Sequence, residues 1–448
     1  MVFDTKFIMN WQDLLSTDRL MIKDGKIITK SSHAPNDGVR SDFHTDYDRV
    51  VFSTSFRKLG RKTQVHPFAK SDHTHNRLTH SVEVASVGRS LGNSVGQGLA
   101  QKGLLPKHIS SYDIGTLVQV ACLAHDLGNP PFGHTGEDAL REWFCQNHHY
   151  LQTLSKKEQA DITTYEGNAH SLRIVTTTEM YAHTGGMRLT CASLGVLMKY
   201  PWGSVGQTKF NIYQSEMDII QKVADRLGLV KLGVDRWARH PLSYLMESAD
   251  DICYALLDLE DAVELDLIGF DDFAKVVKPL LGADFDEYQK ISDKKQRIGA
   301  MRGRAIGRAI DEVAKRFFEH HDGLLHGAFI YKDLLDSCDN SVKETLQNAK
   351  NLAKYQIFNH HSKLITEIAS FGCLGQILDL IVPAVYAKLT QQNLTTKHRL
   401  ALELLKDSPI TDDDTLYDGY MKVLDFVGGL TDNSAGRLAR ELSGVGLI

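Results

Sequence analysis

The sequence has only 10 prolines in 448 residues, and it has no closely spaced pair of cysteines. Scarce proline allows long uninterrupted helices, because proline removes a hydrogen bond from a helix interior and clashes with the preceding turn. The six cysteines are scattered and form no Cys-x-x-Cys pair, which argues against a zinc cluster or a thiol redox motif. We interpret them as small buried hydrophobic residues.

Long apolar runs are also lacking. No uninterrupted apolar stretch reaches the roughly 18 residues that a membrane span needs. The N-terminus MVFDTKFIMNWQDLL has no basic start followed by an apolar block. These absences predict a cytoplasmic protein with no membrane contact. The net charge of −5 gives no overall attraction to nucleic acid, so nucleic acid is not indicated as a partner, while a local basic patch stays open.

Strand-like alternation is nearly absent, and helical periodicity dominates from about residue 50. We expect helices over roughly 80–102, 113–127, 136–148, 166–178, 188–199, 214–227 and 241–265, then helical blocks at 270–350 and 351–405. No internal repeat or Pro/Gly/Ser-rich linker divides the chain. The sequence therefore predicts an all-α fold with three parts: a polar, turn-rich N-terminal arm at 1–49, a core at 50–265, and a helical C-terminal lobe at 266–448 packed on that core.

Two adjacent His-Asp pairs occur, and their surroundings differ. His125-Asp126 ends the apolar stretch IGTLVQVACLAHDLG, which the prolines of the following GNPP forbid from continuing as a helix. A helix end of this kind holds two side chains at the rim of a core. The other pair, His321-Asp322 in FFEHHDGLLHG, has no comparable set of partner residues. We interpret this second pair as structural.

Two further residues complete a candidate metal site. His80 opens a predicted helix, and Asp250 lies in the acidic helix MESADDICYALLDLED, on one face with Tyr254 and Asp258. Two imidazoles and two carboxylates suit a divalent cation such as Mn or Mg, or another transition metal such as Fe, Zn or Ni. An ion held by four protein groups keeps positions for water and a phosphate oxygen. The set therefore indicates metal-assisted attack at phosphorus.

The segment GNPPFGHTGEDAL carries a second candidate pair, His134 and Glu137. The spacing of Thr135 and Asp138 matches a helix-capping box, so part of this pattern is explained by helix initiation. Capping requires neither His134 nor Glu137, however. These two fit an imidazole that moves a proton and a carboxylate that sets its tautomer. Whether the imidazole acts as acid, base or nucleophile stays open.

A polyphosphate bound at such a site would also need cationic side chains. Arg77 precedes His80 by three residues and would reach the same site from the start of that helix. Lys199 in MKYPW and Lys209 in TKFNIYQSE are further candidates, although a single lysine is most often a solvated surface charge.

Eight segments of the chain resemble the deoxyguanosinetriphosphate triphosphohydrolase family within the HD superfamily. They are SFRKLGRKTQV (55–65), HNRLTHSVEV (75–84), LAHDLGNPPFGHTGE (123–137), YEGNAHSLRI (165–174), LMKYPW (197–202), YQSEMDI (213–219), MESADDICYALLDLEDA (246–262) and FVGGLTD (426–432). Their order and spacing follow the family, and HDLG-PPFGH-GE followed by EGNA is highly specific. The resemblance implies an HD-domain helical bundle with a helical C-terminal lobe.

The same resemblance implies an activity and residue roles. The activity is hydrolysis of dGTP and other deoxynucleoside triphosphates to deoxynucleoside and inorganic triphosphate, by attack of water on the α-phosphorus. The implied metal ligands are His80, His125, Asp126 and Asp250, and the implied catalytic pair is His134 and Glu137. Tyr254 and Asp258 look like contacts to the deoxyribose 3′-hydroxyl. The residues that look like triphosphate contacts are Arg77, Lys199 and Lys209, with Tyr200 beside them.

The chain departs from the family's usual pattern at two positions. Many relatives have His where this chain has Asn129, and Gln where it has His170. We expect both residues, together with Glu166, to line the site, so the preferred base stays open. The family also implies a homo-oligomer of even subunit number, and some members are activated by a nucleotide bound at a second, allosteric site.

Two alternatives stay open. One is an HD phosphohydrolase of another nucleotide, such as guanosine tetraphosphate or a cyclic dinucleotide, although those enzymes usually lack the PPFGH-GE and EGNA segments. The other is a non-catalytic nucleotide sensor or nucleic-acid-binding protein. Retention of all the candidate ligands and of the candidate catalytic pair argues against this second alternative.

Overall fold

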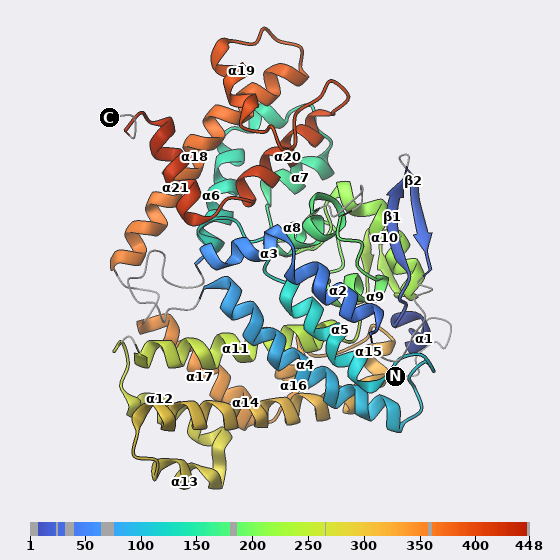
Figure 1. Cartoon of the computed structure of the whole chain (residues 1–448), viewed down its shortest axis with the longest axis vertical. Helices are drawn as coiled ribbons and strands as arrows, with labels where there is room; N and C mark the ends of the chain where they lie inside the picture. Colours follow the sequence, from blue (N-terminus) through green and yellow to red (C-terminus); the bar gives the residue numbers. More distant parts are fainter. Residues whose placement is uncertain are drawn as a thin grey trace.

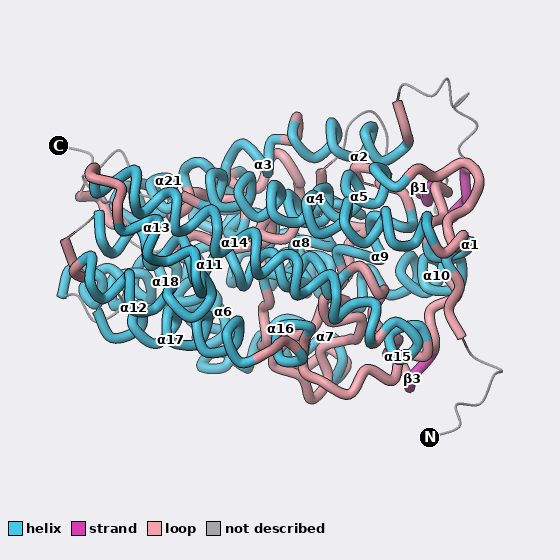
Figure 2. The backbone as a smooth tube through the Cα atoms, turned by 90° about the horizontal axis from the view of Figure 1, so that it is seen from below, coloured by secondary structure: helices cyan, strands magenta, loops and turns pink. Residues whose placement is uncertain are grey.

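The structure is a computed structural model that describes residues 8–23, 26–31, 40–63, 76–179, 186–264, 266–356 and 361–445. Helices dominate these residues, so the prediction of an all-α fold is confirmed. The described strands form two small antiparallel pairs, and Figure 2 shows strands only at the end of the molecule where α1 (Trp11–Leu14) lies. The pairs are β1 (Arg19–Lys23) with β2 (Lys26–Lys30), and β3 (Lys231–Gly233) with β4 (Arg236–Trp237).

A larger apolar core is built mainly by helices from the N-terminal and middle parts of the chain, in the centre and lower part of Figure 1. These helices are α2 (Asp42–Val51), α3 (Thr54–Lys58), α4 (Arg77–Gln101), α5 (Ser111–Ala124), α9 (Cys191–Leu197), α10 (Met217–Leu227), α11 (Ser243–Glu264), α12 (Phe270–Leu281), α13 (Phe285–Gln289), α14 (Lys294–Glu319), α15 (His321–Leu325), α16 (Leu334–Ser337) and α17 (Asn340–Gln356).

A smaller apolar core lies at the top of Figure 1. Its helices are α6 (Gly133–Gln146), α7 (Lys156–Thr163), α18 (His361–Leu389), α19 (Thr396–Glu403), α20 (Leu416–Gly428) and α21 (Asp432–Leu442). The short helix α8 (Gly167–Arg173) joins the two cores, because Ala169 is buried in the smaller core and Leu172 in the larger one.

This grouping differs from the boundary expected at residue 265. Helices α12 to α17, expected in the C-terminal lobe, contribute to the larger core through contacts with α11 and α4. Helix α6, expected in the central core, packs on α18 in the smaller one. Helical periodicity identifies the apolar face of each helix but not the partner on which that face packs.

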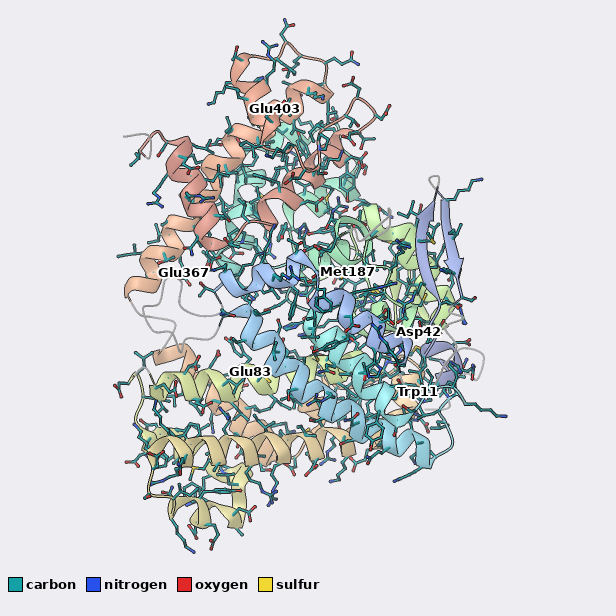
Figure 3. The ribbon with its side chains drawn as sticks, viewed as in Figure 1. Trp11, Asp42, Glu83, Met187, Glu367 and Glu403 are labelled. Atoms are coloured by element: carbon teal, nitrogen blue, oxygen red, sulfur yellow. The ribbon has the colours of Figure 1, made fainter. Side chains whose placement is uncertain are left out.

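The described part of the predicted N-terminal arm also contributes to the larger core. Met9, Trp11, Leu14 and Leu15 are each less than 5% exposed, which differs from the expectation of a segment that stays apart from the core. Trp11, labelled in Figure 3, packs on Phe317 with ring centroids 6.4 Å apart. The turn-rich stretch on which the expectation rested, SSHAPNDG, lies mostly outside the described residues.

Helices α4 and α5 approach each other along a stripe of small residues. A Cβ atom on Gly92 would lie 2.7 Å from the Cα of Gly115, and one on Gly96 would lie 2.2 Å from the carbonyl oxygen of Ser111. Neither position has room for a side chain, so glycine is what allows the two backbones to touch. The close contact fixes the relative position of α4, which carries His80, and α5, which His125 directly follows.

One of the described helices, α18, contains a stretch that is long and apolar enough to cross a bilayer, Leu364–Leu389. This stretch contacts α6, α20 and α21, and its Leu374, Ile377 and Leu378 are fully buried in the smaller core. The central helix of a globular lobe has the same length and composition. The stretch is therefore weak evidence for a membrane span.

The cysteines are partly as expected. Four are buried, Cys373 is half-buried and Cys145 is exposed. Burial raises the pKa of the Cys122 and Cys253 thiols, so both stay neutral hydrophobic groups.

Candidate active site

A cavity of about 360 Å³ opens where the two cores meet. Its walls come from α4, α6, α8, α11 and α18 and from the segments that follow α5 and α9. This volume is in the range of small-molecule sites. Every residue that the sequence predicts for the site lines this cavity, except Asp258 and His170.

The four candidate metal ligands come together from three elements. His80 lies in the first turn of α4, His125 and Asp126 follow the last turn of α5, and Asp250 lies on α11. One atom each from His80, His125 and Asp126 lies within 4.8 Å of the other two. The Oδ1 of Asp250 is 3.1 Å from the Nε2 of His80 and 3.5 Å from the Nε2 of His125.

The donor set fits a divalent cation of intermediate hardness, because it offers two imidazole nitrogens and two carboxylates within one cavity wall. The Nδ1 of His125 is 2.6 Å from the carbonyl oxygen of Cys122. This bond orients the ring so that Nε2 faces the carboxylates, on the side where a metal would be bound. Sequence order gave no hint of this contact.

The charges of the set stabilise one another. Burial opposes the charge of His125, but Asp126 and Asp250 outweigh it and raise its pKa to about 9. Burial likewise disfavours the Asp126 carboxylate, but Arg77 and the imidazoles lower its pKa to about 2. The carboxylates are therefore ionised, as a cation requires.

Arg77 connects the candidate metal ligands to the segment that carries His134. Its Nη1 donates a hydrogen bond to Oδ2 of Asp126 at 2.8 Å. Its Nη2 lies against Gly133, where a Cβ atom would be only 2.6 Å away, so a larger residue there would displace the guanidinium. Gly133 also has a φ of 59°, which glycine adopts most readily.

The second candidate pair is in contact. The Nδ1 of His134 lies 3.1 Å from Oε2 of Glu137, and the other oxygen, Oε1, accepts the N–H of Gly167 at 2.7 Å. Burial disfavours the Glu137 charge, but the bond to His134 and the nearby Lys209 lower its pKa. The Glu137 side chain is 3% exposed and the His134 side chain 79%. The imidazole is therefore held at one nitrogen by a fixed carboxylate while the rest of its ring is open.

The helix-capping interpretation of this segment is wrong. Helix α6 begins at Gly133 with Phe132 as its N-cap, three residues earlier than a cap at Thr135 would require, and no side chain caps it. Asp138 bonds to Arg141 instead. Helix initiation therefore leaves the identity of His134 and Glu137 unexplained.

A second buried carboxylate, Glu166, lies beside Glu137. Glu166 is fully buried, and its Oε2 is 2.9 Å from Nζ of Lys209 and 3.5 Å from Nη2 of Arg141. The same Arg141 nitrogen is 3.4 Å from Oε2 of Glu137. Two cations therefore stabilise two neighbouring carboxylates. Arg141 was not predicted for this region, although its position four residues after Glu137 on one helix is a usable signal.

Lys199 and Tyr200 form another part of the wall. The Nζ of Lys199 lies 3.3 Å from Oε1 of Glu247 and 5.6 Å from the centroid of the Tyr200 ring. Burial opposes the charge of Lys199, but Glu247 outweighs it and raises the pKa, so the ammonium stays charged. Lys199 is therefore a partly buried cation in the cavity and not a solvated surface charge.

The acidic face of α11 is only partly in the cavity. Asp250 and Tyr254 line it, as one helical face predicts. Asp258, one turn farther along, is 5% exposed and lies outside the lining.

The two departures from the family pattern lie in different places. Asn129 lines the cavity and its Nδ2 donates to Oδ1 of Asp126 at 2.5 Å, so it contacts a candidate ligand directly. His170 lies behind the wall, with its ring 5.2 Å from that of Tyr165 and its Nε2 3.8 Å from Asp425. Burial lowers its pKa to about 4, so it is a neutral core residue.

The cavity also has walls that the sequence analysis missed. Thr63, Phe132 and Asn168 line it, as do Thr366 and Glu367 on α18. Figure 3 shows Glu367 on the lower half of this helix. Nothing in the local sequence of α18 marks these two residues, because their place depends on how the smaller core packs on the larger one. The second His-Asp pair lies outside the lining, where Nε2 of His321 accepts from Nε1 of Trp11 at 3.0 Å.

Comparisons with known proteins identify the family of the chain. Residues 77–227 match the family described as HD domain, a range that includes three of the four candidate ligands but not Asp250. A Pseudomonas aeruginosa protein named "Deoxyguanosinetriphosphate triphosphohydrolase-like protein" is 40% identical over 97% of this chain and 99% of its own length. A protein of that name from Synechocystis is 35% identical over 98% of this chain and 100% of its own. The "Deoxyguanosinetriphosphate triphosphohydrolase" of Klebsiella pneumoniae is 28% identical over 90% and 94%.

Proposed function

The chain belongs to the deoxyguanosinetriphosphate triphosphohydrolase family of HD-domain phosphohydrolases, and from this premise we propose that it cuts deoxynucleoside triphosphates into deoxynucleoside and inorganic triphosphate. The observation that carries the proposal is the meeting of two sets of residues in one cavity. The candidate ligands His80, His125, Asp126 and Asp250 lie on its wall together with the His134–Glu137 pair. The coarser activity, phosphohydrolysis of a nucleotide, follows from the family itself.

The four ligands would hold a divalent cation, Mn, Mg or another metal, at the wall of the cavity. Such an ion polarises phosphate oxygens and lowers the pKa of water. Around it the chain's own cations, Arg77, Lys199 and Lys209, would bind the triphosphate, with Tyr200 beside Lys199. Their charges oppose the negative charge that accumulates on phosphate oxygens as water attacks the α-phosphorus.

His134 would move the proton that the reaction needs. Breaking the bond between the α-phosphorus and the 5′-oxygen leaves an alkoxide that must gain a proton, while the attacking water loses one. Because Glu137 lies against Nδ1, Nε2 is the nitrogen left to exchange a proton with the substrate or with water. Gly167 fixes Glu137 through its N–H, so the pair is oriented before the substrate binds.

Preference for the deoxy sugar is assigned to Tyr254. Its side chain is half-buried in the cavity wall, one turn from Asp250. A ribose packed against this ring would have little room for a 2′-hydroxyl. Asp258 would contact the 3′-hydroxyl only after a shift toward the cavity, so we assign it a weaker part in sugar binding. Equal turnover of GTP and dGTP would remove the assignment of Tyr254.

The test is an assay of each deoxynucleoside triphosphate, singly and in mixtures, with Mn or Mg. Chromatography separates triphosphate from pyrophosphate and phosphate. Triphosphate release by the wild type, and none by a His125→Ala variant that is folded by circular dichroism, supports the proposal. Release of pyrophosphate or phosphate would contradict it. Faster turnover in mixtures would indicate an activating nucleotide bound at a second site.

Turnover of guanosine tetraphosphate or a cyclic dinucleotide alone would favour the alternative HD activity. Absence of any turnover, with nucleotide bound, would favour a sensor. We also expect a homo-oligomer of even subunit number, which light scattering during gel filtration measures.

A further inference from the structure

One buried carboxylate beside the cavity has no part in the reaction as described. Asp432, the first residue of α21, is 3% exposed. Its Oδ1 accepts the N–H of Phe132 at 2.9 Å, and its Oδ2 accepts the N–H of Thr63 at 2.8 Å. Phe132 and Thr63 both line the cavity. A single side chain from the smaller core therefore joins two separate parts of the cavity wall.

Phe132 has an unusual backbone. Its φ of 65° and ψ of 12° lie in the left-handed region, where a bulky residue is a clear exception. Such a conformation persists only where its surroundings hold it, and it is common at active sites. The bond from the Phe132 N–H to a charged carboxylate is of the stronger, charge-assisted kind. Asp432 is therefore well suited to hold this turn.

The turn at Phe132 determines where His134 lies. Helix α6 begins directly after it, without a side-chain cap, and His134 is in the first turn of that helix. The His134 side chain is 79% exposed, and in the described part of the chain its hydrogen bond is to Glu137, on the same helix. Its position therefore depends mainly on the direction in which α6 leaves the turn.

A second buried polar side chain, that of Lys62, links the same three segments. Nζ of Lys62, the residue before Thr63, donates to the carbonyl oxygens of Asn129 at 2.5 Å and Gly428 at 2.7 Å. Residues 62–63, 129–132 and 428–432 are thus linked by one lysine side chain and one carboxylate. The segment FVGGLTD (426–432) is one of the eight that resemble the family, and no role was assigned to it from the sequence. It contributes the Gly428 carbonyl and the Asp432 carboxylate to these links.

We propose that Asp432 is a positioning residue for His134: by holding the left-handed turn at Phe132, it sets the direction in which α6 presents the imidazole to the cavity. It touches neither the substrate nor the metal site. The inference deepens the proposed function and rests on it for the reaction in which His134 takes part.

The test compares Asp432→Asn with a matched control, Asp418→Asn. Asp418 is also an aspartate in the first turn of a helix of the smaller core, where it accepts the N–H and the hydroxyl of Thr415 at 3.0 and 2.6 Å. It lies outside the cavity lining. An asparagine at 432 turns an amide donor toward one of the two backbone N–H groups. Asp432→Glu keeps the charge and serves as the second variant.

For Asp432→Asn we expect kcat to fall about 10- to 100-fold, the size of a general acid–base contribution, with KM and bound Mn changed less than about 3-fold. Asp432→Glu gives an intermediate kcat, and Asp418→Asn keeps the wild-type value. A purely structural role would lower kcat and bound Mn together, or lower kcat equally in the Asp432→Asn and Asp418→Asn variants. Either result overturns the proposal.

Hydrogen–deuterium exchange provides a measurement that does not depend on activity. Exchange at the Phe132 and Thr63 amides is expected to rise at least about 10-fold in Asp432→Asn and to stay unchanged in Asp418→Asn. Unchanged exchange at Phe132 in Asp432→Asn would overturn the proposal even if activity were lost. If the wild type hydrolyses no deoxynucleoside triphosphate, the proposed function fails, whereas the exchange result still decides whether Asp432 holds the turn.

Discussion

The carboxylate of Asp250 lies 3.1 Å from Nε2 of His80, a residue 170 positions away in the chain. The same oxygen lies 3.5 Å from Nε2 of His125. Asp250 therefore joins α11 to the α4–α5 pair at the point where a cation would bind. The ligand set exists only when these three helices are packed together.

Asp250→Asn is expected to weaken the binding of Mn by at least about 10- to 100-fold, because it removes a charged oxygen ligand. Titration calorimetry with Mn, together with the metal content of the purified protein, measures the effect. The matched control is Asp251→Asn, on the same helix, whose carboxylate pairs with Lys350 at 2.5 Å and lies outside the cavity lining. Equal loss of Mn from both variants would contradict the assignment.

Glu137→Gln is expected to lower kcat about 10- to 100-fold with bound metal unchanged. Glutamine can still accept the N–H of Gly167, but it removes the negative charge that His134 faces. Steady-state kinetics between pH 5 and 9 measure the effect and should show an altered pH profile. Asp138→Asn, one residue along and largely exposed, is the control and should behave as the wild type. If kcat of Glu137→Gln stayed within about 2-fold of the wild-type value, Glu137 would have no catalytic role.

Lys209→Ala is expected to raise KM about 10-fold, with a smaller effect on kcat, because the ammonium is proposed to bind the triphosphate in the ground state and the transition state alike. Lys209 pairs with Glu166 at 2.9 Å, and its side chain is 41% exposed. Because the ammonium is not enclosed by the protein, it can turn toward a phosphate. Lys222→Ala, which removes a lysine bonded to the Ile27 carbonyl, is the control. A changed kcat with an unchanged KM would argue against phosphate binding by Lys209.

Acid is expected to destabilise the fold through His240. This ring is fully buried, with Nε2 3.0 Å from the carbonyl oxygen of Leu14 and Nδ1 accepting the N–H of Leu242, so only the neutral form fits. Burial lowers its pKa from 6.5 to about 4. The unfolded chain therefore binds this proton first as the pH falls. The contribution of the neutral His240 to the free energy of unfolding is fully present above pH 6.5. It is lost as the pH falls from 6.5 to 4.

Between pH 7 and 5 this loss amounts to about 2 kcal/mol. Urea unfolding of the wild type and of His240→Gln at both values measures it. The variant should be less stable at pH 7 but should lose about 2 kcal/mol less on acidification. Parallel pH dependence in the two proteins would show that His240 does not carry this effect.

The candidate ligands could be predicted from sequence because their residue types are chemically restrictive and their neighbours are specific. His125 and Asp126 stand at a helix end that the following prolines enforce, and Asp250 and Tyr254 share one helical face. The prediction extended this face of α11 one turn too far, because Asp258 lies outside the cavity lining. A helical repeat gives direction, whereas the end of a cavity depends on what packs beside the helix.

Other features could not be predicted because they depend on partners distant in the chain. Asp432 bonds to Phe132 across 300 positions, and no local pattern gives that pairing. The start of α6 was placed too late, because the left-handed Phe132 begins the helix three residues before Thr135, where a polar cap was expected. His170 was expected in the site from its place in the EGNA motif, but its side chain faces Asp425 on α20.

Since Gly92 and Gly96 bring α4 and α5 into backbone contact, the two candidate imidazole ligands stand on one stiff unit. His134 stands on α6, which belongs to the other core. Small rotations of one core against the other would change the reach of His134 while the spacing of His80 and His125 stays constant. Warming should therefore affect metal binding and turnover at different temperatures. We expect the protein to stop turning over substrate at a temperature where it still holds its metal.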